Sequence, residues 1–297
     1  MEPSPCIAVF GEVLEEGWPD DPVPAGLPLR VARHLAAFGF RPLLITRVGH
    51  DEAARRLLAH LVRWGVDTQG VQRDATHPTG RGARASDLPE QPWDFVDAAQ
   101  ALRAFAERRP ALLYFGTLAQ RSPASRQALQ RLVACSPGPR VFDVNLVEPW
   151  YEPRMLPACL LSTDVLVMNE RELGLLSRLC GPVEGLAERM AALLNRFLLH
   201  RVVVRRGDGA WLQDASGADA FEPGTGSTRS AEGARDAFAA VLLAGMAAGW
   251  PSDVTLMRAA AFARATGGRL PEDQGFYSPF LREWQLAGRE ALVETLS

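Results

Sequence analysis

The sequence contains no lysine, so arginine supplies all 32 of its basic residues. A P-loop needs a lysine that reaches the phosphates of the nucleotide, so this motif is excluded. Schiff-base chemistry on a lysine and the lysine of protein kinases are excluded for the same reason. Any nucleotide chemistry in this chain must therefore use backbone amides, arginines, carboxylates and a metal ion.

Cysteine is also sparse, and long apolar runs are absent. The four cysteines lack C-x-x-C spacing, which argues against a zinc site or a disulfide framework and predicts buried thiols in a reducing compartment. No segment approaches the ~18 apolar residues of a membrane helix, and residues 1–5 lack the basic start of a signal peptide. We therefore expect a cytoplasmic protein.

The composition is that of an ordinary globular chain. Of 297 residues, 47% are hydrophobic and 23% are charged, so a large core can form. The net charge of -3 gives no support to nucleic-acid or membrane binding. No linker or composition shift marks a boundary, and residues 1–297 are expected to form one domain.

Short apolar runs alternate with segments of helical periodicity. The expected strands are Cys6–Phe10, Pro42–Thr46, Ala111–Phe115, Arg140–Asp143, Asp164–Met168, Arg201–Val204 and Gly209–Gln213. The expected helices are Leu29–Phe38, Glu52–Trp64, Pro123–Ala134, Glu170–Leu179, Leu186–Leu199, Ala234–Ala248, Val254–Thr266 and Gly288–Leu296. This alternation predicts an α/β fold with a mostly parallel sheet covered on both faces. Two stretches, Glu16–Ala25 and Arg81–Trp93, are expected to be loops.

The strongest candidate for chemistry is Gly233-Ala234-Arg235-Asp236, which leads into an apolar helix. Successive amides at a helix N-terminus form an anion site. An aspartate in the first turn could accept the proton of a hydroxyl group that attacks a phosphate. The alternative is an acidic residue that only stabilises the start of a helix.

This segment resembles the second signature of the PfkB (ribokinase-like) carbohydrate kinases, and other motifs of that family follow the same order along the chain. They are Gly11–Leu14, Gly26–Leu35 in a form typical of bacterial fructokinases, Val48–Asp51, Trp64–Thr68, Pro78–Gly80, Tyr114–Ser122, Phe142–Leu146 and Asn169–Glu172. The resemblance implies a three-layer α/β/α sandwich with a mostly parallel central sheet. It also implies ATP and Mg²⁺ as cofactors, and a sugar and a nucleotide as the only partners.

The resemblance also assigns roles to residues. Asp236 would be the catalytic base, and Gly233, Ala234 and Arg235 would form the anion hole. Asn169 and Glu172 would organise magnesium, Glu172 through water. Glu16, Gly26, Arg30 and Asn145 would contact the sugar. Arg205, Gly207 and Ala260 would lie beside the nucleotide.

Several of these positions depart from the family pattern. Arg235 replaces the second glycine of the anion hole, Arg30 replaces a sugar-binding asparagine, and Arg205 replaces a threonine. The three arginines are explained either by drift in an arginine-rich chain or by an anionic ligand that they bind. Arginines turned outward into solvent would rule out the second explanation.

The lid over the sugar is expected to be reduced to residues 12–26 and 81–95. In many relatives the lid sheet also forms the dimer interface, so the chain is expected to be a monomer or a homodimer. A missing lid would also admit water to the site.

Two functions from different classes remain open at this stage. The first is ATP-dependent phosphoryl transfer to a hydroxyl group of a ketose such as fructose, or of a related small carbohydrate. The second is a catalytically impaired homologue that binds a nucleotide or an anionic small molecule without transfer. Hydrolases and dinucleotide enzymes have little support, because the chain has no G-x-S-x-G elbow and no G-x-G-x-x-G after a strand.

Overall fold

The computed structural model of the chain describes residues 4–18, 21–82, 90–217, 219–224 and 234–286. Its centre is a nine-stranded sheet with the order β12-β11-β10-β9-β8-β7-β1-β4-β5. Seven strands are parallel: β1 (Cys6–Phe10), β4 (Arg41–Val48), β5 (Val71–Arg73), β7 (Leu112–Phe115), β8 (Arg140–Asp143), β9 (Val165–Asn169) and β10 (Arg201–Arg206). The antiparallel strands β11 (Gly209–Asp214) and β12 (Asp219–Pro223) complete one edge.

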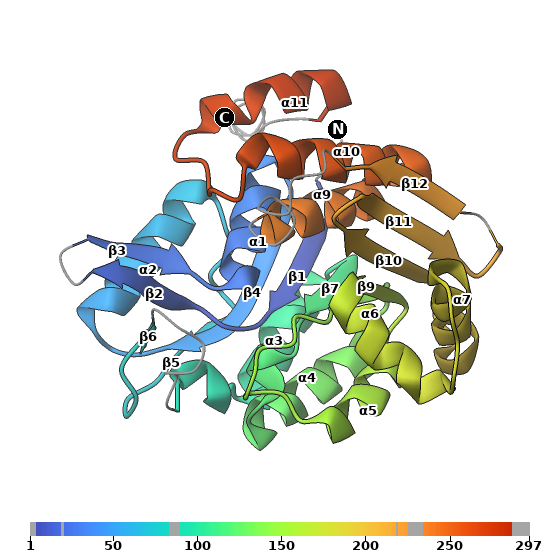
Figure 1. The fold of residues 1–297 in the computed structure, drawn as a ribbon. Helices are drawn as coiled ribbons and strands as arrows, with labels where there is room; N and C mark the ends of the chain where they lie inside the picture. The colour runs from blue at the N-terminus through green and yellow to red at the C-terminus, as the bar shows by residue number, and fades with distance from the viewer. Residues whose placement is uncertain (1–3, 19–20, 83–89, 218, 225–233, 287–297) are drawn as a thin grey trace.

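Helices cover both faces of this sheet (Figure 1). One face carries α1 (Leu27–Ala37), α2 (Glu52–Trp64), α9 (Arg235–Ala248), α10 (Ser252–Thr266) and α11 (Ser278–Trp284). The other carries α3 (Ala98–Arg108), α4 (Pro123–Cys135), α5 (Leu156–Leu161), α6 (Glu170–Leu176) and α7 (Leu186–Phe197). Side chains of β1 alternate between the two cores, with Val9 in the first and Phe10 in the second. The three-layer α/β/α sandwich with a mostly parallel sheet is confirmed.

Most predicted elements occur within a few residues of their expected bounds. The helix Glu52–Trp64 and the strand Arg140–Asp143 match those bounds at both ends. The helix begins after Asp51, whose side chain accepts a hydrogen bond from the Ala54 amide at 2.9 Å, and it ends at Gly65 with a left-handed φ of 80°. Short 3₁₀ turns occur at Pro92–Phe95, Leu118–Gln120, Pro153–Met155, Ser177–Cys180 and Gln274–Phe276.

The loop expected over Glu16–Ala25 is wrong, because this stretch forms strands. β2 (Leu14–Trp18) pairs antiparallel with β3 (Asp21–Ala25) and parallel with β6 (Gly80–Arg81), in a small sheet of order β3-β2-β6. The prolines of β3 are tolerated because β3 is an edge strand of this sheet. Glu15 fixes β2 to α2, since its two oxygens accept hydrogen bonds from Arg56 at 3.0 and 2.8 Å. Within the predicted lid segment 12–26, the strands β2 and β3 are therefore paired and attached to the main body.

Three other predictions have mixed outcomes. The last helix expected at Gly288–Leu296 lies outside the described residues, and α11 lies before it. The four cysteines are free thiols, but only Cys159 is buried and Cys135 is exposed, so the expectation of four buried thiols is wrong. None of the helices in the described part of the chain has the length and apolarity that a bilayer crossing requires.

Candidate active site

Polar residues lie at or just after the carboxyl ends of several parallel strands. Glu12 follows β1, Asp143 ends β8, Asn169 ends β9, and Arg205 lies near the end of β10. In parallel α/β sheets, ligands bind beyond the carboxyl ends of the strands. They bind at the position where the order of the strands in the sheet reverses. The sheet order places β1 beside both β7 and β4, so that reversal occurs at β1.

A cavity of about 470 Å³ opens at this edge between the ends of β8, β9 and β10. Six residues predicted from the sequence line it: Asn145, Asn169, Glu172, Arg205, Gly207 and Arg235. Segments 90 residues apart along the chain thus contribute to one hollow. Motif order predicted that these residues form one site, and in the structure they line the same cavity.

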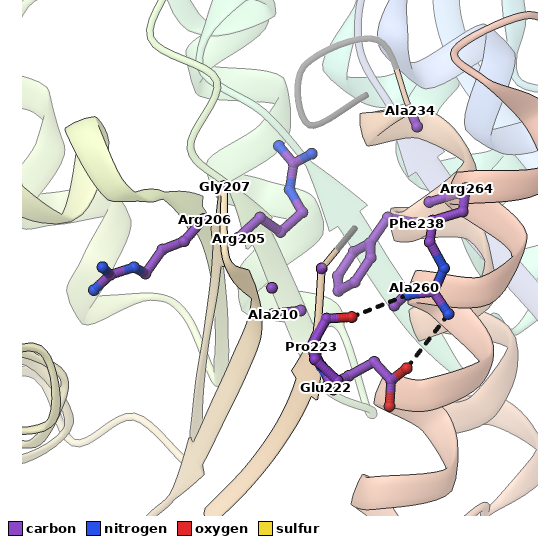
Figure 2. Close-up of a pocket in the computed structure, with 13 residues that line it drawn as sticks. Arg205, Arg206, Gly207, Ala210, Glu222, Pro223, Ala234, Phe238, Ala260 and Arg264 are labelled. Atoms are coloured by element: carbon purple, nitrogen blue, oxygen red, sulfur yellow. Dashed lines mark hydrogen bonds and ion pairs between the residues drawn. The ribbon is translucent and has the colours of Figure 1, made fainter. Parts of the chain in front are cut away.

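A smaller recess of about 70 Å³ adjoins this cavity on the side of α10. Arg205, Arg206 and Gly207 line both, and Ala234, Phe238 and Ala260 are among the other residues of the recess (Figure 2). Arg264 also lines the recess, and it donates hydrogen bonds to the Pro223 carbonyl at 3.3 Å and to Glu222 at 3.4 Å. The residues predicted to lie beside the nucleotide, Arg205, Gly207 and Ala260, therefore occur together.

Asn169 and Glu172 form a capping box at the start of α6. The Asn169 side chain accepts a hydrogen bond from the Glu172 amide at 2.8 Å, and Glu172 Oε2 accepts one from the Asn169 amide at 2.8 Å. Glu172 Oε1 also accepts a hydrogen bond from the Leu146 amide at 3.1 Å. The Asn-x-x-Glu motif thus has a clear local role, which is to fix the glutamate carboxylate at the cavity wall.

Arg235 extends from the first turn of α9 into the acidic part of this cavity. Its Nε donates to Asp143 Oδ1 at 2.9 Å, and its Nη1 donates to Asn145 and to Glu172 Oε1, each at 3.2 Å. Its Nη2 donates to Asp143 Oδ1 and, at 3.4 Å, to Glu172 Oε2. A guanidinium has five N–H groups, and these five contacts use them all. Tyr114 donates to the remaining oxygen of Asp143 at 2.8 Å.

Arg205 is buried beside this group, with its guanidinium carbon 5.8 Å from the centre of the Phe238 ring. Burial and the nearby charge of Arg235 lower the pKa of Arg205 to about 10, and Asp143 and Glu172 oppose that change. Arg205 therefore stays charged at neutral pH. The two arginines balance the charges of the two carboxylates at the cavity wall.

Asp236, the predicted base, lies in the next position of α9 and is almost fully buried. Its Oδ2 accepts a hydrogen bond from Arg30 Nε at 2.5 Å and lies 3.4 Å from His34 Nε2. The Tyr277 hydroxyl lies 2.8 Å from the other nitrogen of the His34 ring. Burial would raise the pKa of Asp236, but the contact with His34 and the charge of Arg30 lower it to about 2. Asp236 is therefore a carboxylate at every physiological pH.

Two predicted sugar contacts lie near Arg30. Gly26 begins α1 with a φ of 105°, and a Cβ atom there would lie 2.5 Å from the Glu12 carbonyl oxygen, so only glycine fits. Glu16 lies on β2 with an exposed side chain, and the charge of Arg30 reaches it. Gly233 lies outside the described residues.

The arginines do not point into solvent, so the anion explanation is not ruled out on that ground. The structure nevertheless provides protein carboxylates as partners for two of them. Arg30 binds Asp236, and Arg235 binds Asp143 and Glu172. Their charges are thus balanced without an added anion.

Glu12 is a site residue that the sequence analysis missed. Burial raises the pKa of its carboxyl group to about 7, against hydrogen bonds from the Glu12 and Leu27 amides, while the negative charge of Asp143 adds to the rise. Because the folded-state pKa is raised, the stabilising contribution of this group is complete below the unfolded-state value of about 4.3. It is lost as the pH rises through 7.

The change Glu12→Gln tests this contribution. Between about pH 4 and pH 8 we expect the free energy of unfolding of the wild type to fall by about 3 kcal/mol relative to the variant. Urea denaturation at a series of pH values measures the difference. Glu184→Gln, at an exposed position before α7, is the control. Parallel stability curves for the wild type and Glu12→Gln would contradict the assignment.

The acidic residues of this edge do not fit a directly bound magnesium ion. Magnesium requires open oxygen ligands in octahedral geometry, whereas both oxygens of Asp143 and both of Glu172 accept N–H or O–H donors. Across the described residues, no group of three or more His, Cys, Asp or Glu side chains is arranged to hold a metal. The predicted role of Glu172 through water stays a prediction.

Asp143, His34, Tyr114 and Tyr277 were also not predicted as site residues. Asp143 carried a usable signal, because it ends a buried strand at the ligand-binding edge. His34 and Tyr277 carried none, since their contact joins residues 243 positions apart along the chain.

Comparisons with known proteins identify the family and support the fold. The family model described as "pfkB family carbohydrate kinase" matches residues 22–269. A fructokinase from Vibrio cholerae O395, solved with fructose, ADP and potassium, superposes with a TM-score of 0.73 at 22% identity, over 94% of this chain and 99% of that chain. A structure from E. coli provisionally named ribokinase II, in complex with ATP and Mg²⁺, gives a TM-score of 0.76 at 19% identity, over 94% and 99%.

One curated sequence also matches. It is a protein of Pyrococcus horikoshii whose name assigns it provisionally to the sugar kinases, and it is 27% identical over 143 residues. The match covers 41% of this chain and 43% of that protein, which is less than half of either. The similarity to solved structures, by contrast, extends over nearly the whole chain.

Proposed function

The chain belongs to the pfkB family of carbohydrate kinases, and we propose that it transfers the γ-phosphoryl group of ATP to a hydroxyl group of a small carbohydrate. A ketose such as fructose, or a related sugar, is the proposed acceptor. The partners in this proposal are small molecules alone, and the protein acts as a monomer or a homodimer.

The observation that carries this proposal is the placement of Asp236. Its carboxylate lies in the first turn of α9, one position after Arg235, which lines the cavity, and its low pKa keeps it ionised. The first amides of a helix lack acceptors within the helix, so the start of α9 also offers N–H groups to a phosphate. A base and an anion-binding backbone thus occur within one turn.

In the proposed reaction, the acceptor hydroxyl attacks the γ-phosphorus and gives its proton to Asp236. The new O–P bond forms while the bond from the γ-phosphorus to the β–γ bridging oxygen breaks, and ADP leaves. ATP enters as a co-substrate, supplied as its magnesium complex, with the nucleotide beside Arg205, Gly207 and Ala260. Phosphoryl transfer depends mainly on positioning and charge stabilisation, which the fixed arginines and amides provide.

Arg30 is the part of the site that must respond to the acceptor. It holds Asp236 Oδ2 and the Gly268 carbonyl, yet its side chain remains 28% exposed. An acceptor hydroxyl that reaches Asp236 must share this oxygen with Arg30 or displace it. We therefore place the acceptor beneath the hairpin β2–β3, next to Gly26 and Glu16.

Two measurements test the proposal. ATP at about 100 times its Kd should stabilise the folded protein by about 2.7 kcal/mol, which a thermal denaturation series detects. ADP release should then depend on sugar when a panel of ketoses, aldoses and sugar acids is assayed with ATP, and a reaction without sugar measures background hydrolysis. No stabilisation by ATP would argue against any nucleotide chemistry. Stabilisation without sugar-dependent ADP release would indicate binding without transfer.

A further inference from the structure

Two buried carboxylates, those of Asp143 and Glu172, accept hydrogen bonds from the same cation, the guanidinium of Arg235. Asp143 is fully buried and Glu172 is 4% exposed. Two carboxylates in such surroundings cannot both remain ionised at low cost without a positive partner. The partner here is the guanidinium of Arg235, whose five N–H groups all point to these carboxylates and to Asn145.

The position of Arg235 in its own helix is unfavourable. A positive side chain in the first turn meets the positive end of the helix dipole, which costs about 0.3–1 kcal/mol. Burial also lowers the pKa of Arg235, but the charges of Asp143 and Glu172 outweigh that effect and raise it above the ordinary arginine value. The arginine is therefore held at this place by the acid pair, and not by its own helix.

We propose that the Asp143–Glu172 pair is a cation site whose permanent occupant is the side chain of Arg235, so that this chain binds no divalent metal ion of its own at the sheet edge. This inference concerns the protein without nucleotide and holds whether or not it transfers a phosphoryl group. A metal ion that enters as part of a nucleotide complex would then meet carboxylates that the guanidinium of Arg235 already engages.

A guanidinium and a divalent metal ion require different arrangements of carboxylate oxygens. A guanidinium is a planar donor of N–H groups and matches carboxylates in a fork geometry. A divalent ion instead requires the lone pairs of several oxygens within one coordination sphere. Removing the guanidinium should free Asp143 Oδ1, withdraw the side-chain donors from both Glu172 oxygens and leave an acid pair without its cation, which attracts a divalent ion.

The test is Mn²⁺ binding to the protein without nucleotide, followed by electron paramagnetic resonance and calorimetry. The wild type should bind no stoichiometric Mn²⁺. Arg235→Ala should bind one ion, at least about tenfold more tightly than the wild type, because affinity rises with the charge of the ligands. Adding Glu172→Gln to that variant should remove the binding. Mn²⁺ should also raise the Tm of Arg235→Ala and leave that of the wild type unchanged.

Arg206→Ala is the matched control, since Arg206 lines the same cavity but pairs with the exposed residues Glu170 and Asp208. It should gain no Mn²⁺ binding. Arg235→Met, which keeps a long side chain but has neither the positive charge nor N–H donors, replaces the alanine variant if the latter does not fold. Stoichiometric Mn²⁺ binding by the wild type that Glu172→Gln abolishes would overturn the proposal. A folded Arg235 variant that binds no Mn²⁺ would overturn it as well.

Discussion

Replacing Asp236 with asparagine should lower kcat by about 10²- to 10⁴-fold, the usual contribution of a positioned general base, and should leave the affinity for ATP unchanged. Asparagine has nearly the same shape as aspartate but cannot accept the proton of the acceptor hydroxyl. The proposed nucleotide contacts at Arg205, Gly207 and Ala260 belong to β10, the turn after it and α10, and they are not altered by the change. Steady-state kinetics and ATP-dependent thermal stabilisation measure the two quantities separately.

A matched control for this substitution exists in the neighbouring helix. Asp253 lies in the first turn of α10, as Asp236 does in α9, but its side chain is exposed. Asp253→Asn should therefore change neither kcat nor ATP affinity. Turnover that survives Asp236→Asn at the level of this control would refute the role of Asp236 as the base.

The second large effect is on stability. Asp143→Ala should lower the free energy of unfolding by about 3–5 kcal/mol, because breaking a buried ion pair leaves the partner charge without compensation. Arg235 would lose its closest partner, and the buried Tyr114 hydroxyl would lose its acceptor. Chemical denaturation of the wild type and the variant measures this loss.

Two further variants show how much of the loss in stability comes from the buried ion pair. Asp208→Ala removes an exposed partner of Arg206, 3.1 Å away, and surface pairs contribute at most about 1 kcal/mol. The double variant Asp143→Ala with Arg235→Ala should be less destabilised than the two single changes predict together, because the orphaned charge is gone. Asp143→Ala as mild as Asp208→Ala would show that the acid–arginine cluster adds little stability.

The sequence predicted the framework of the fold well. The apolar run Cys6–Phe10 became a central strand, because a strand buried on both faces is apolar throughout. The helix over residues 52–64 was found at both ends, because a capping aspartate and a terminal glycine bound it. In these elements the local signal and the tertiary environment agree.

The β2–β3 hairpin could not be predicted in the same way. Prolines, a glycine and acidic residues in 14–25 indicate a loop by local preference. The strands form because β3 is an edge strand and because Glu15 is held by Arg56 from α2. That second contact links positions 41 residues apart, which no local pattern reports.

The site was predicted in part for a similar reason. Motif order placed Asn145, Asn169, Glu172, Arg205 and Arg235 together, and they line one cavity. It did not predict that Arg235 binds Asp143, or that Arg30 binds Asp236, because these pairs are 92 and 206 residues apart. The identity of a replaced residue indicates a departure from the family pattern, while its partner appears only in three dimensions.

The central claim is that a phosphoryl group passes from ATP to a sugar hydroxyl with Asp236 as the base. The most direct test supplies ATP labelled with ¹⁸O on the γ-phosphoryl group together with each sugar that supports ADP release, and analyses the products by mass spectrometry. We predict a sugar monophosphate that carries the label with the wild type and none with Asp236→Asn. Label found only in inorganic phosphate, or in equal amounts of ester from both proteins, would contradict the account.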